Sequence, residues 1–221
     1  MTRLVGRRAA LQAAGAFGLA AALPRAAWAA PNHQDTRFEV LREGSQLGIL
    51  YLDFRNEGDT LVLDTKLEIV VKIAFVVAYR FSQFRSETWR GDQLLAYDVR
   101  TNDDGTKTTA SARLADGKLV VDRTKGPATA PADAVPATFW NPVIINRTNA
   151  LNVDDAEPVS IAVAPQGAET IEAAGAQLAA KRYAVTGGVE RTVWYAADDD
   201  RWLQMQFIVR DGSTIIYRRM A

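Results

Sequence analysis

The sequence predicts a mostly-β protein with a single antiparallel, strongly curved sheet that closes into a barrel or half-barrel. Three observations lead to this prediction. Apolar and polar residues alternate through long runs, Gly- and Asp-rich turn signals recur roughly every 8 to 15 residues, and no crossover helices are evident between the runs. One proline-rich segment interrupts the pattern and is expected to contain at most a short helix.

The beginning of the chain has the pattern of an export signal peptide, so it is set apart from the fold. Arg7 and Arg8 precede a modestly apolar stretch, and a small-x-small cleavage site ends at Ala29. The paired arginines favour the twin-arginine route, with the general secretory route as the alternative. Residues 1–29 are therefore predicted to be the signal, and residues 30–221 a single β domain in the periplasm.

Composition excludes several classes of protein. The chain has 26 Lys and Arg, 26 Asp and Glu, one His and no Cys. Without the four arginines of the signal, 22 basic and 26 acidic residues leave a net charge of −4, which lacks the basic footprint of a nucleic-acid-binding protein. The lack of Cys excludes disulfides, thiol catalysis and Cys-ligated metals. The single His, His33, is expected in a frayed terminus, so we predict neither a metal nor a cofactor.

Residues 61–81, LVLDTKLEIVVKIAFVVAYRF, are apolar enough to suggest a membrane helix, but they alternate like a strand. Their charges leave no uncharged window of the length that a transmembrane helix needs, about 18 residues. The stretch is too long for an ordinary strand, so we expect a turn near residues 72–74 or one very long, curved strand. The expected solvated residues are Lys66 and Glu68, and the expected buried face includes Ile69, Val71, Ile73, Phe75 and Val77.

Turn signals divide the remaining chain into an antiparallel meander of about ten strands. Gly and Asp-Gly supply the positive φ that tight hairpins need. Two acid runs, residues 103–104 and 198–200, fall in these turns, and turn chemistry explains them better than calcium binding, which needs spaced acids. The signals are REGS (42–45), RNEGD (55–59), NDDGT (102–106), ADGK (115–118), TGG (186–188), ADDDR (197–201) and RDGS (210–213).

Residues 126–158 hold five of the eight prolines and break the alternation. Insertions of this length between strands often serve as lids or functional loops. Asn141 is suited to cap a short helix whose first residue is Pro142. We therefore expect a lid or long insertion that lies over the open side of the sheet, with Trp140 pointing inward.

Six aromatic residues are the best candidates for a binding site, because they supply apolar area and each Trp or Tyr adds a polar atom. The alternative is that they fill an ordinary barrel core. Arg80 and Glu87 are polar candidates, either as a buried pair that forms a site or as an exposed cross-strand pair. No catalytic residue is assigned. The aromatic candidates are Tyr79, Phe81, Trp89, Trp140, Trp194 and Tyr195.

Six segments together resemble one uncharacterised family of exported bacterial proteins, a mostly-β domain of unknown function. They are VKIAFVVAYRF, ETWRGDQL, RTNDDGT, PATFWNP, TVWYAADDDRW and RDGSTIIY, collinear over nearly all of the chain after the signal. Thr138, Phe139 and Ala196 depart from the family's pattern. More loosely, the plan is similar to the half-barrels of periplasmic lipoprotein carriers, which implies a bent sheet that cups an apolar ligand beneath a lid.

Together these observations predict a soluble, monomeric periplasmic protein that binds an apolar or amphipathic, lipid-like molecule and catalyses no reaction. Its one other expected partner is the export machinery, and no transmembrane span follows the signal. Two alternatives stay open. One is a structural or partner-binding envelope protein with a solid interior, and the other is a hydrolase that uses carboxylates. A cavity under residues 126–158 would favour ligand binding, whereas a buried acid pair with access to solvent would favour hydrolysis.

Overall fold

The computed structural model of the chain describes residues 33–73 and 75–221. The predicted signal, including Arg7, Arg8 and the cleavage after Ala29, lies outside the described residues. In the part that is described, no helix is long and apolar enough to cross a membrane.

The described residues form one sheet of 15 strands, in the order β8-β7-β6-β5-β4-β3-β2-β1-β15-β14-β13-β12-β11-β10-β9. Hydrogen-bonded neighbours are consecutive along the chain except for β1 and β15, and they are antiparallel except for β9 and β10. The strands are β1 (Thr36–Arg42), β2 (Ser45–Glu57), β3 (Thr60–Ile73), β4 (Val76–Arg90), β5 (Gln93–Asp103), β6 (Thr106–Ala115), β7 (Lys118–Arg123), β8 (Ala128–Pro131), β9 (Val135–Pro136), β10 (Asn149–Leu151), β11 (Pro158–Ala173), β12 (Ala176–Gly187), β13 (Arg191–Ala196), β14 (Trp202–Ile208) and β15 (Thr214–Arg219).

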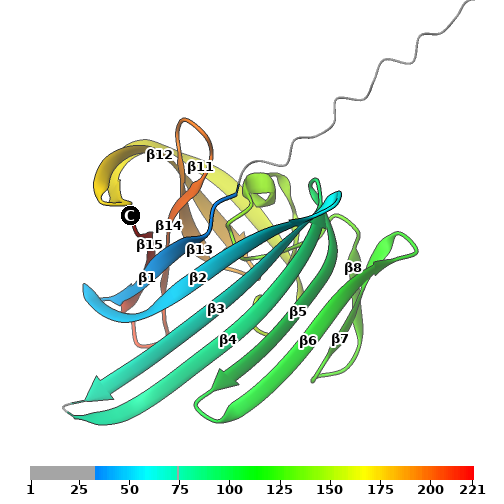
Figure 1. Cartoon of the computed structure of the whole chain (residues 1–221), viewed down its shortest axis with the longest axis horizontal. Coiled ribbons are helices and arrows are strands. Elements are labelled where there is room, and N and C mark those ends of the chain that lie inside the picture. The colour runs from blue at the N-terminus through cyan, green and yellow to red at the C-terminus, as the bar shows by residue number, and fades with distance from the viewer. Residues whose placement is uncertain (1–32, 74) are drawn as a thin grey trace, which may run out of the picture.

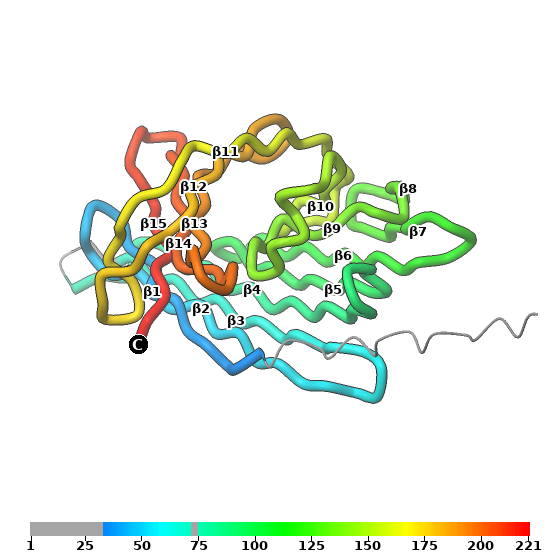
Figure 2. The backbone as a smooth tube through the Cα atoms, turned by 90° about the horizontal axis from the view of Figure 1, so that it is seen from above, coloured from blue at the N-terminus to red at the C-terminus, as the bar shows by residue number. Residues whose placement is uncertain are grey.

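The sheet is strongly curved but does not close. The long strands β2–β6 form one wall, and β11–β15 form the other (Figure 1). Seen from above, β11 and β12 lie across from β4–β6 (Figure 2). The two edge strands, β8 and β9, are not hydrogen-bonded to each other, although β8 contacts β10 and β11. The predicted fold class, a mostly-β half-barrel made from one curved sheet, is confirmed.

The sheet contains more strands than the ten expected. All seven sequence turn signals connect consecutive strands, as predicted. The additional turns include one at Gly91, between β4 and β5, and one at Gly175, between β11 and β12, both with positive φ. The proline-rich segment also contributes three short strands, β8, β9 and β10.

The stretch 61–81 forms a hairpin, as the alternation and the expected turn indicate. β3 ends at Ile73 and β4 begins at Val76. Lys66 and Glu68 are exposed and pair with each other at 2.9 Å. Odd positions face the inside of the curve: the side chains of Leu61, Leu63, Thr65 and Leu67 are buried, and those of Ile69, Val71 and Val77 are half-buried.

The prediction that Phe75 is buried is wrong. Phe75 lies in the connection between β3 and β4, and its side chain is fully exposed. The alternation of faces applies within a strand and ends where the chain reverses, so the parity of position 75 carries no information about burial. Ile73 belongs to β3, but its side chain lies outside the described part of the structure.

The inner face of β3 and β4 consists of six cross-strand layers. At the end marked by Trp89, which we call the Trp89 end, the first four layers are buried. At the opposite end, the Tyr79 end, the last two layers are only partly buried. The layers, in order, are Leu61 with Trp89, Leu63 with Glu87, Thr65 with Arg85, Leu67 with Gln83, Ile69 with Phe81, and Val71 with Tyr79.

The proline-rich segment 126–158 is built into the sheet and the core. It supplies β8, β9 and β10, and its residues 134–140 form an unbroken buried run. A 3₁₀ helix, η1 (Pro142–Asn146), follows this run. As predicted, Asn141 caps it, with its side chain accepting a hydrogen bond from the backbone N–H of Val143 and with proline at the first position.

A smaller apolar cluster lies on the outer face of β12–β14. Trp194 packs there with Leu203 and with three alanines from β11–β13. The ends of β11 and β12 shelter this cluster through Ile171 and Leu178. A register shift in β11 between Pro165 and Ala168 accompanies the bend of this hairpin over the outer face.

Candidate functional site

A buried carboxyl group lies at the centre of the Trp89 end. Glu87 points inward from β4 and is completely buried. Its Oε2 accepts a hydrogen bond of 2.9 Å from Nε1 of Trp89 and one of 2.8 Å from Nε1 of Trp140. The two indole rings meet edge to face, with centroids 5.6 Å apart. We call these three residues the Glu87 clamp, because they tie the proline-rich segment to β4.

Burial raises the pKa of Glu87, because transferring a charged carboxylate out of water is costly. The hydrogen bonds from Trp140 and Trp89 and the positive charge of Arg85 oppose this shift. Oε1 of Glu87 has no hydrogen-bond partner among the described residues. Glu87 is also the only carboxylate among the buried residues described, so the buried acid pair that would favour hydrolysis does not form around it.

The far side of the buried run is held by the opposite wall. The hydroxyl of Tyr195, on β13, donates a 2.9 Å hydrogen bond to the backbone oxygen of Phe139. Phe139 has a φ of 65°, a left-handed conformation that is unfavourable for a residue other than glycine. The phenol of Tyr97, on β5, donates a 2.8 Å hydrogen bond to the backbone oxygen of Val153. Side chains from both walls therefore fix the segment inside the half-barrel.

His33 contacts the Glu87 clamp from outside. Its ring stacks on Phe54 at a centroid distance of 4.9 Å and meets Trp140 edge-on at 5.3 Å. The expected frayed position is therefore wrong for His33, which is half-buried. Burial lowers its pKa, which favours the neutral imidazole.

A cleft of about 1700 Å³ opens at the Trp89 end, outside the buried run. Its apolar lining includes Phe38, Phe54, Trp140 and Trp202, together with Ile145 of η1. Acidic and basic side chains also line the cleft, which therefore presents both apolar surface and charges of both signs. The charged residues are Asp35, Arg37, Asp59, Arg90, Asp92, Asp199, Asp200, Arg201 and Arg219.

The aromatic candidates from the sequence do not form one site. Trp89 and Tyr195 flank the buried run, and Trp140 is its last residue. Phe81 and Tyr79 lie on the inner face at the Tyr79 end, where Tyr79 donates a hydrogen bond of 2.7 Å to a carboxylate oxygen of Asp103. Trp194 belongs to the outer cluster and donates a 2.8 Å hydrogen bond to Glu169.

Arg80 and Glu87 do not pair, either as a buried or as an exposed pair. They are seven residues apart on one strand, so their side chains point to opposite faces of the sheet. Arg80 is exposed on the outer face, and Glu87 is buried on the inner face. The positive charge beside Glu87 comes from Arg85, two residues away on the same face.

Sequence reasoning missed three inward polar residues: Gln83, Arg85 and Arg191. Continuing the odd-position pattern of β4 from Phe81 to Trp89 would have found the first two, because every second residue of a strand shares one face. Arg191 begins β13 and has the same parity as the inward Tyr195. We expected the inner face to carry apolar side chains, and this expectation led us to overlook the three polar residues on it.

The acid runs lie in turns, as turn chemistry predicts. Asp104 and Asp200 both adopt positive φ in hairpin connections. Asp199 accepts a hydrogen bond from the backbone N–H of Arg201, and Lys181 pairs with Asp200 at 2.8 Å. No cluster of three or more potential metal ligands occurs in the described ranges.

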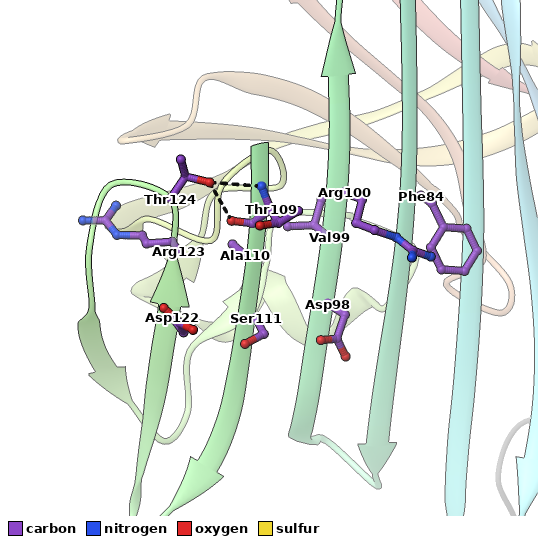
Figure 3. Close-up of a pocket in the computed structure, with 10 residues that line it drawn as sticks. All are labelled: Phe84, Asp98, Val99, Arg100, Thr109, Ala110, Ser111, Asp122, Arg123 and Thr124. Carbon is purple, nitrogen blue, oxygen red and sulfur yellow. Dashed lines mark hydrogen bonds between the residues drawn. The ribbon is translucent and has the colours of Figure 1, made fainter. Parts of the chain in front are cut away.

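A shallow pocket of about 600 Å³ lies on the outer face of β4–β7 (Figure 3). Asp98, Ser111 and Asp122 line it, and Asp98 is paired with Arg113 at 2.7 Å. Within the described residues no hydrogen bond joins Ser111 to either acid, and no His lines the pocket. The pocket therefore lacks the activating base that a serine nucleophile needs.

Comparison with known families identifies the class of this domain. A family described as "Domain of unknown function (DUF6134)" matches residues 38–220. The chain belongs to this family. The match covers β2–β15 and nearly all of β1, so the DUF6134 domain is the curved sheet itself. The predicted resemblance to an uncharacterised, mostly-β family is confirmed.

The DUF6134 chain is also similar to a solved structure described as a beta-barrel-like protein of domain of unknown function DUF1849 from Brucella abortus. The TM-score is 0.58, the alignment covers 84% of this chain and 94% of that chain, and 12% of the aligned residues are identical. A likeness at this level of identity shows a shared fold. No curated protein sequence matches the chain.

Proposed function

We propose that this protein is exported to the periplasm and binds an amphipathic ligand, without catalysis, in the cleft at the Trp89 end. The observation that carries the proposal is the pairing of an apolar floor with charged residues of both signs in a cleft of about 1700 Å³. Ligand sites combine apolar lining with a few polar groups that orient the ligand. An amphipathic molecule satisfies both kinds of surface at once.

The Glu87 clamp supports this proposal by making the floor rigid. Trp140 is 6% exposed and is fixed by its hydrogen bond to Glu87 and by edge-to-face contacts with Trp89, Phe54 and His33. A preformed apolar surface binds a ligand with little additional loss of conformational freedom. Trp140 is therefore assigned to the floor, whereas η1 provides the adjacent wall.

Binding of a neutral fluorescent probe tests the proposal. N-phenyl-1-naphthylamine should bind saturably, at one site per chain, with quenching of tryptophan emission through Trp140 and Trp202. Ile145→Asp puts a charge on the cleft wall and should weaken binding about tenfold, a loss of about 1.4 kcal/mol. Ile208→Asp makes the same change on a 73% exposed residue of β14 and should leave binding unchanged. Thermal melts of both variants separate binding from folding.

Two results would contradict this assignment. One is a lack of saturable binding by the well-folded protein. The other is an equal loss of affinity in both variants, which would place the probe outside the cleft.

A second candidate function, a structural or partner-binding protein, is favoured by one observation. Residues 134–140 of the proline-rich segment are themselves buried in the interior, where ligand binding under a lid would need space. Under this alternative, the cleft would hold part of another protein. The same probe experiment separates the two, because a surface adapted to a macromolecular partner gives weak, non-saturable binding of a small apolar probe.

A further inference from the structure

Two inward arginines, one on each wall of the half-barrel, lack an ion-pair partner among the described residues. Arg85 projects from β4 and is 7% exposed, and its Nε donates a 2.8 Å hydrogen bond to Thr65. Arg191 projects from β13, lies over the ring of Phe207 at 4.0 Å and donates a 2.7 Å hydrogen bond to the backbone oxygen of Glu190. No carboxylate among the described residues forms an ion pair with either guanidinium.

The two guanidinium groups act on the same inner region from different walls. β4 and β13 belong to the opposite walls of the half-barrel. Both positive charges act to lower the pKa of Tyr217, which lies on the inner face of β15, although burial outweighs them and raises that pKa to about 12. Burial also lowers the pKa of Arg191. Positive charge is therefore concentrated where water is scarce.

Few negative charges compensate for these arginines. Asp154 is exposed and acts on both Arg191 and Tyr217, and its Oδ1 accepts a 2.8 Å hydrogen bond from Gln83. Glu87 lies beside Arg85, but burial raises the pKa of its carboxyl and favours the neutral form. The exposed Glu190 adjoins Arg191 in sequence and acts on it as well. Because Asp154 and Glu190 are exposed to water and form no ion pair with either guanidinium group, both arginines remain able to bind an anionic group.

Apolar side chains surround this positive charge. Inward residues at the Tyr79 end are only partly buried, in contrast to the closed core around Glu87. They come from five strands on both walls, so they offer an apolar surface next to the arginines rather than a single exposed residue. They are Ile69, Phe81, Val163, Tyr183 and Phe207.

We propose that the inner face of the half-barrel binds an amphiphile with an anionic head, its head between Arg85 and Arg191 and its apolar tail along the partly buried side chains at the Tyr79 end. Charge complementarity selects an anionic occupant, because a buried guanidinium without a counter-charge is costly and a carboxylate or phosphate relieves that cost. The apolar surroundings select a head that carries a tail. This inference goes beyond the proposed function, because it assigns a second ligand site on a surface separate from the cleft at the Trp89 end.

The test compares an acid with its neutral ester. Dansyl-labelled undecanoic acid should bind the wild-type protein about tenfold tighter than its methyl ester, a difference of about 1.4 kcal/mol. Arg191→Gln and Arg85→Gln should each reduce this preference to about two- to threefold while leaving ester affinity nearly unchanged. Arg100→Gln changes an exposed arginine on the outer face of β5 and should retain the full preference.

Thermal melts of the two arginine variants and a competition assay complete the test. If the melts show that Arg85→Gln lowers stability, Arg191→Gln provides the main evidence, because Arg85 is the more buried residue and bonds to Thr65. Competition by dodecanoic acid and by dodecyl phosphate distinguishes the two head chemistries, and displacement by either supports the anionic site. Equal affinity for acid and ester, or a preference that survives both arginine substitutions, overturns the inference.

The pattern of results also separates this inference from the proposed function. If Ile145→Asp weakens the neutral probe while the arginine variants keep the acid preference, the cleft binds ligand and the anionic site is wrong. If the arginine variants lose the preference while Ile145→Asp has no effect on any ligand, the ligand lies on the inner face and the cleft is wrong.

Discussion

The indole N–H of Trp140 donates a 2.8 Å hydrogen bond to the carboxyl of Glu87, which precedes it by 53 residues in the sequence. This contact links the proline-rich segment to β4, the central strand of the β2–β6 wall. It also satisfies the buried indole N–H of Trp140 and gives Oε2 of Glu87 a second donor besides Trp89. The Glu87 clamp therefore holds the segment inside the half-barrel together with the phenols of Tyr195 and Tyr97.

Removing the indole N–H of Trp140 should destabilise the fold. Trp140→Phe keeps an aromatic ring but leaves Oε2 of Glu87 with one donor, so we expect a loss of about 1–3 kcal/mol in urea unfolding. Trp194→Phe is the matched control, because its indole donates to Glu169, whose side chain is 42% exposed and can be solvated by water. Trp194→Phe should therefore lower the free energy of unfolding by less than Trp140→Phe does. Equal losses would show that the ring volume, and not the contact with Glu87, accounts for the effect.

Glu87 should make stability depend on pH. Its pKa in the folded state is raised by burial, whereas in the unfolded chain it is ordinary, about 4.3. As the pH rises above that value, Glu87 ionises first in the unfolded chain, because the folded state retains the proton to a higher pH. Unfolding then releases a proton, so the wild type loses stability relative to Glu87→Gln with increasing pH.

Parallel urea titrations of the wild type and Glu87→Gln from pH 4 to pH 8 measure this difference. Glutamine retains an oxygen that accepts from the two indoles, so the clamp geometry survives the change. A difference in free energy that stays constant over this range would show that Glu87 ionises normally in the fold.

The β3–β4 connection should tolerate loss of its aromatic side chain. Phe75→Ala removes a fully exposed ring, so the melting temperature should not move. Leu63→Ala, at a buried position on the inner face of β3, should cost about 2–5 kcal/mol. A large loss from Phe75→Ala would mean that this ring is covered, for example by a second copy of the chain.

The pair Arg7 and Arg8 should be required for export if the twin-arginine assignment is right. Changing both to Lys keeps the charge but removes the paired guanidinium groups. We expect the double variant to accumulate inside the cytoplasm, as measured by fractionation and immunoblotting. Undiminished periplasmic accumulation would favour the general secretory route.

The alternation of apolar and polar residues within each strand made part of the fold predictable. Leu61, Leu63 and Leu67 face inward, as their odd positions indicate. The start of the short helix was also predictable, because the capping by Asn141 and the fixed backbone of Pro142 involve only neighbouring residues. The exposure of Phe75 was not predictable, because odd and even positions stop alternating between faces where the strand ends in a turn. Sequence patterns of this kind therefore predict burial only within a single strand or helix.

The binding residues were harder to predict because they depend on which face each strand buries. Adjacent residues of a strand point to opposite faces, so Trp194 and Tyr195 could not both line the interior. The same rule separates Arg80 from Phe81. The contact between Trp140 and Glu87 has no local signal, since it depends on how the segment threads between the walls.

The pairing of β1 with β15 also governs the speed of folding. Every other hydrogen-bonded pair joins strands that are consecutive in the sequence, whereas Phe38 lies opposite Arg219. Closing so long a loop is entropically costly, so β1–β8 and β9–β15 should form as two local meanders before this seam joins them. A circular permutant that links residue 221 to residue 33 and opens the chain at Asp133, between β8 and β9, makes the seam a local hairpin. Its refolding, followed by stopped-flow tryptophan fluorescence, should be faster than that of the natural order, and equal rates would place the slow step within one of the meanders.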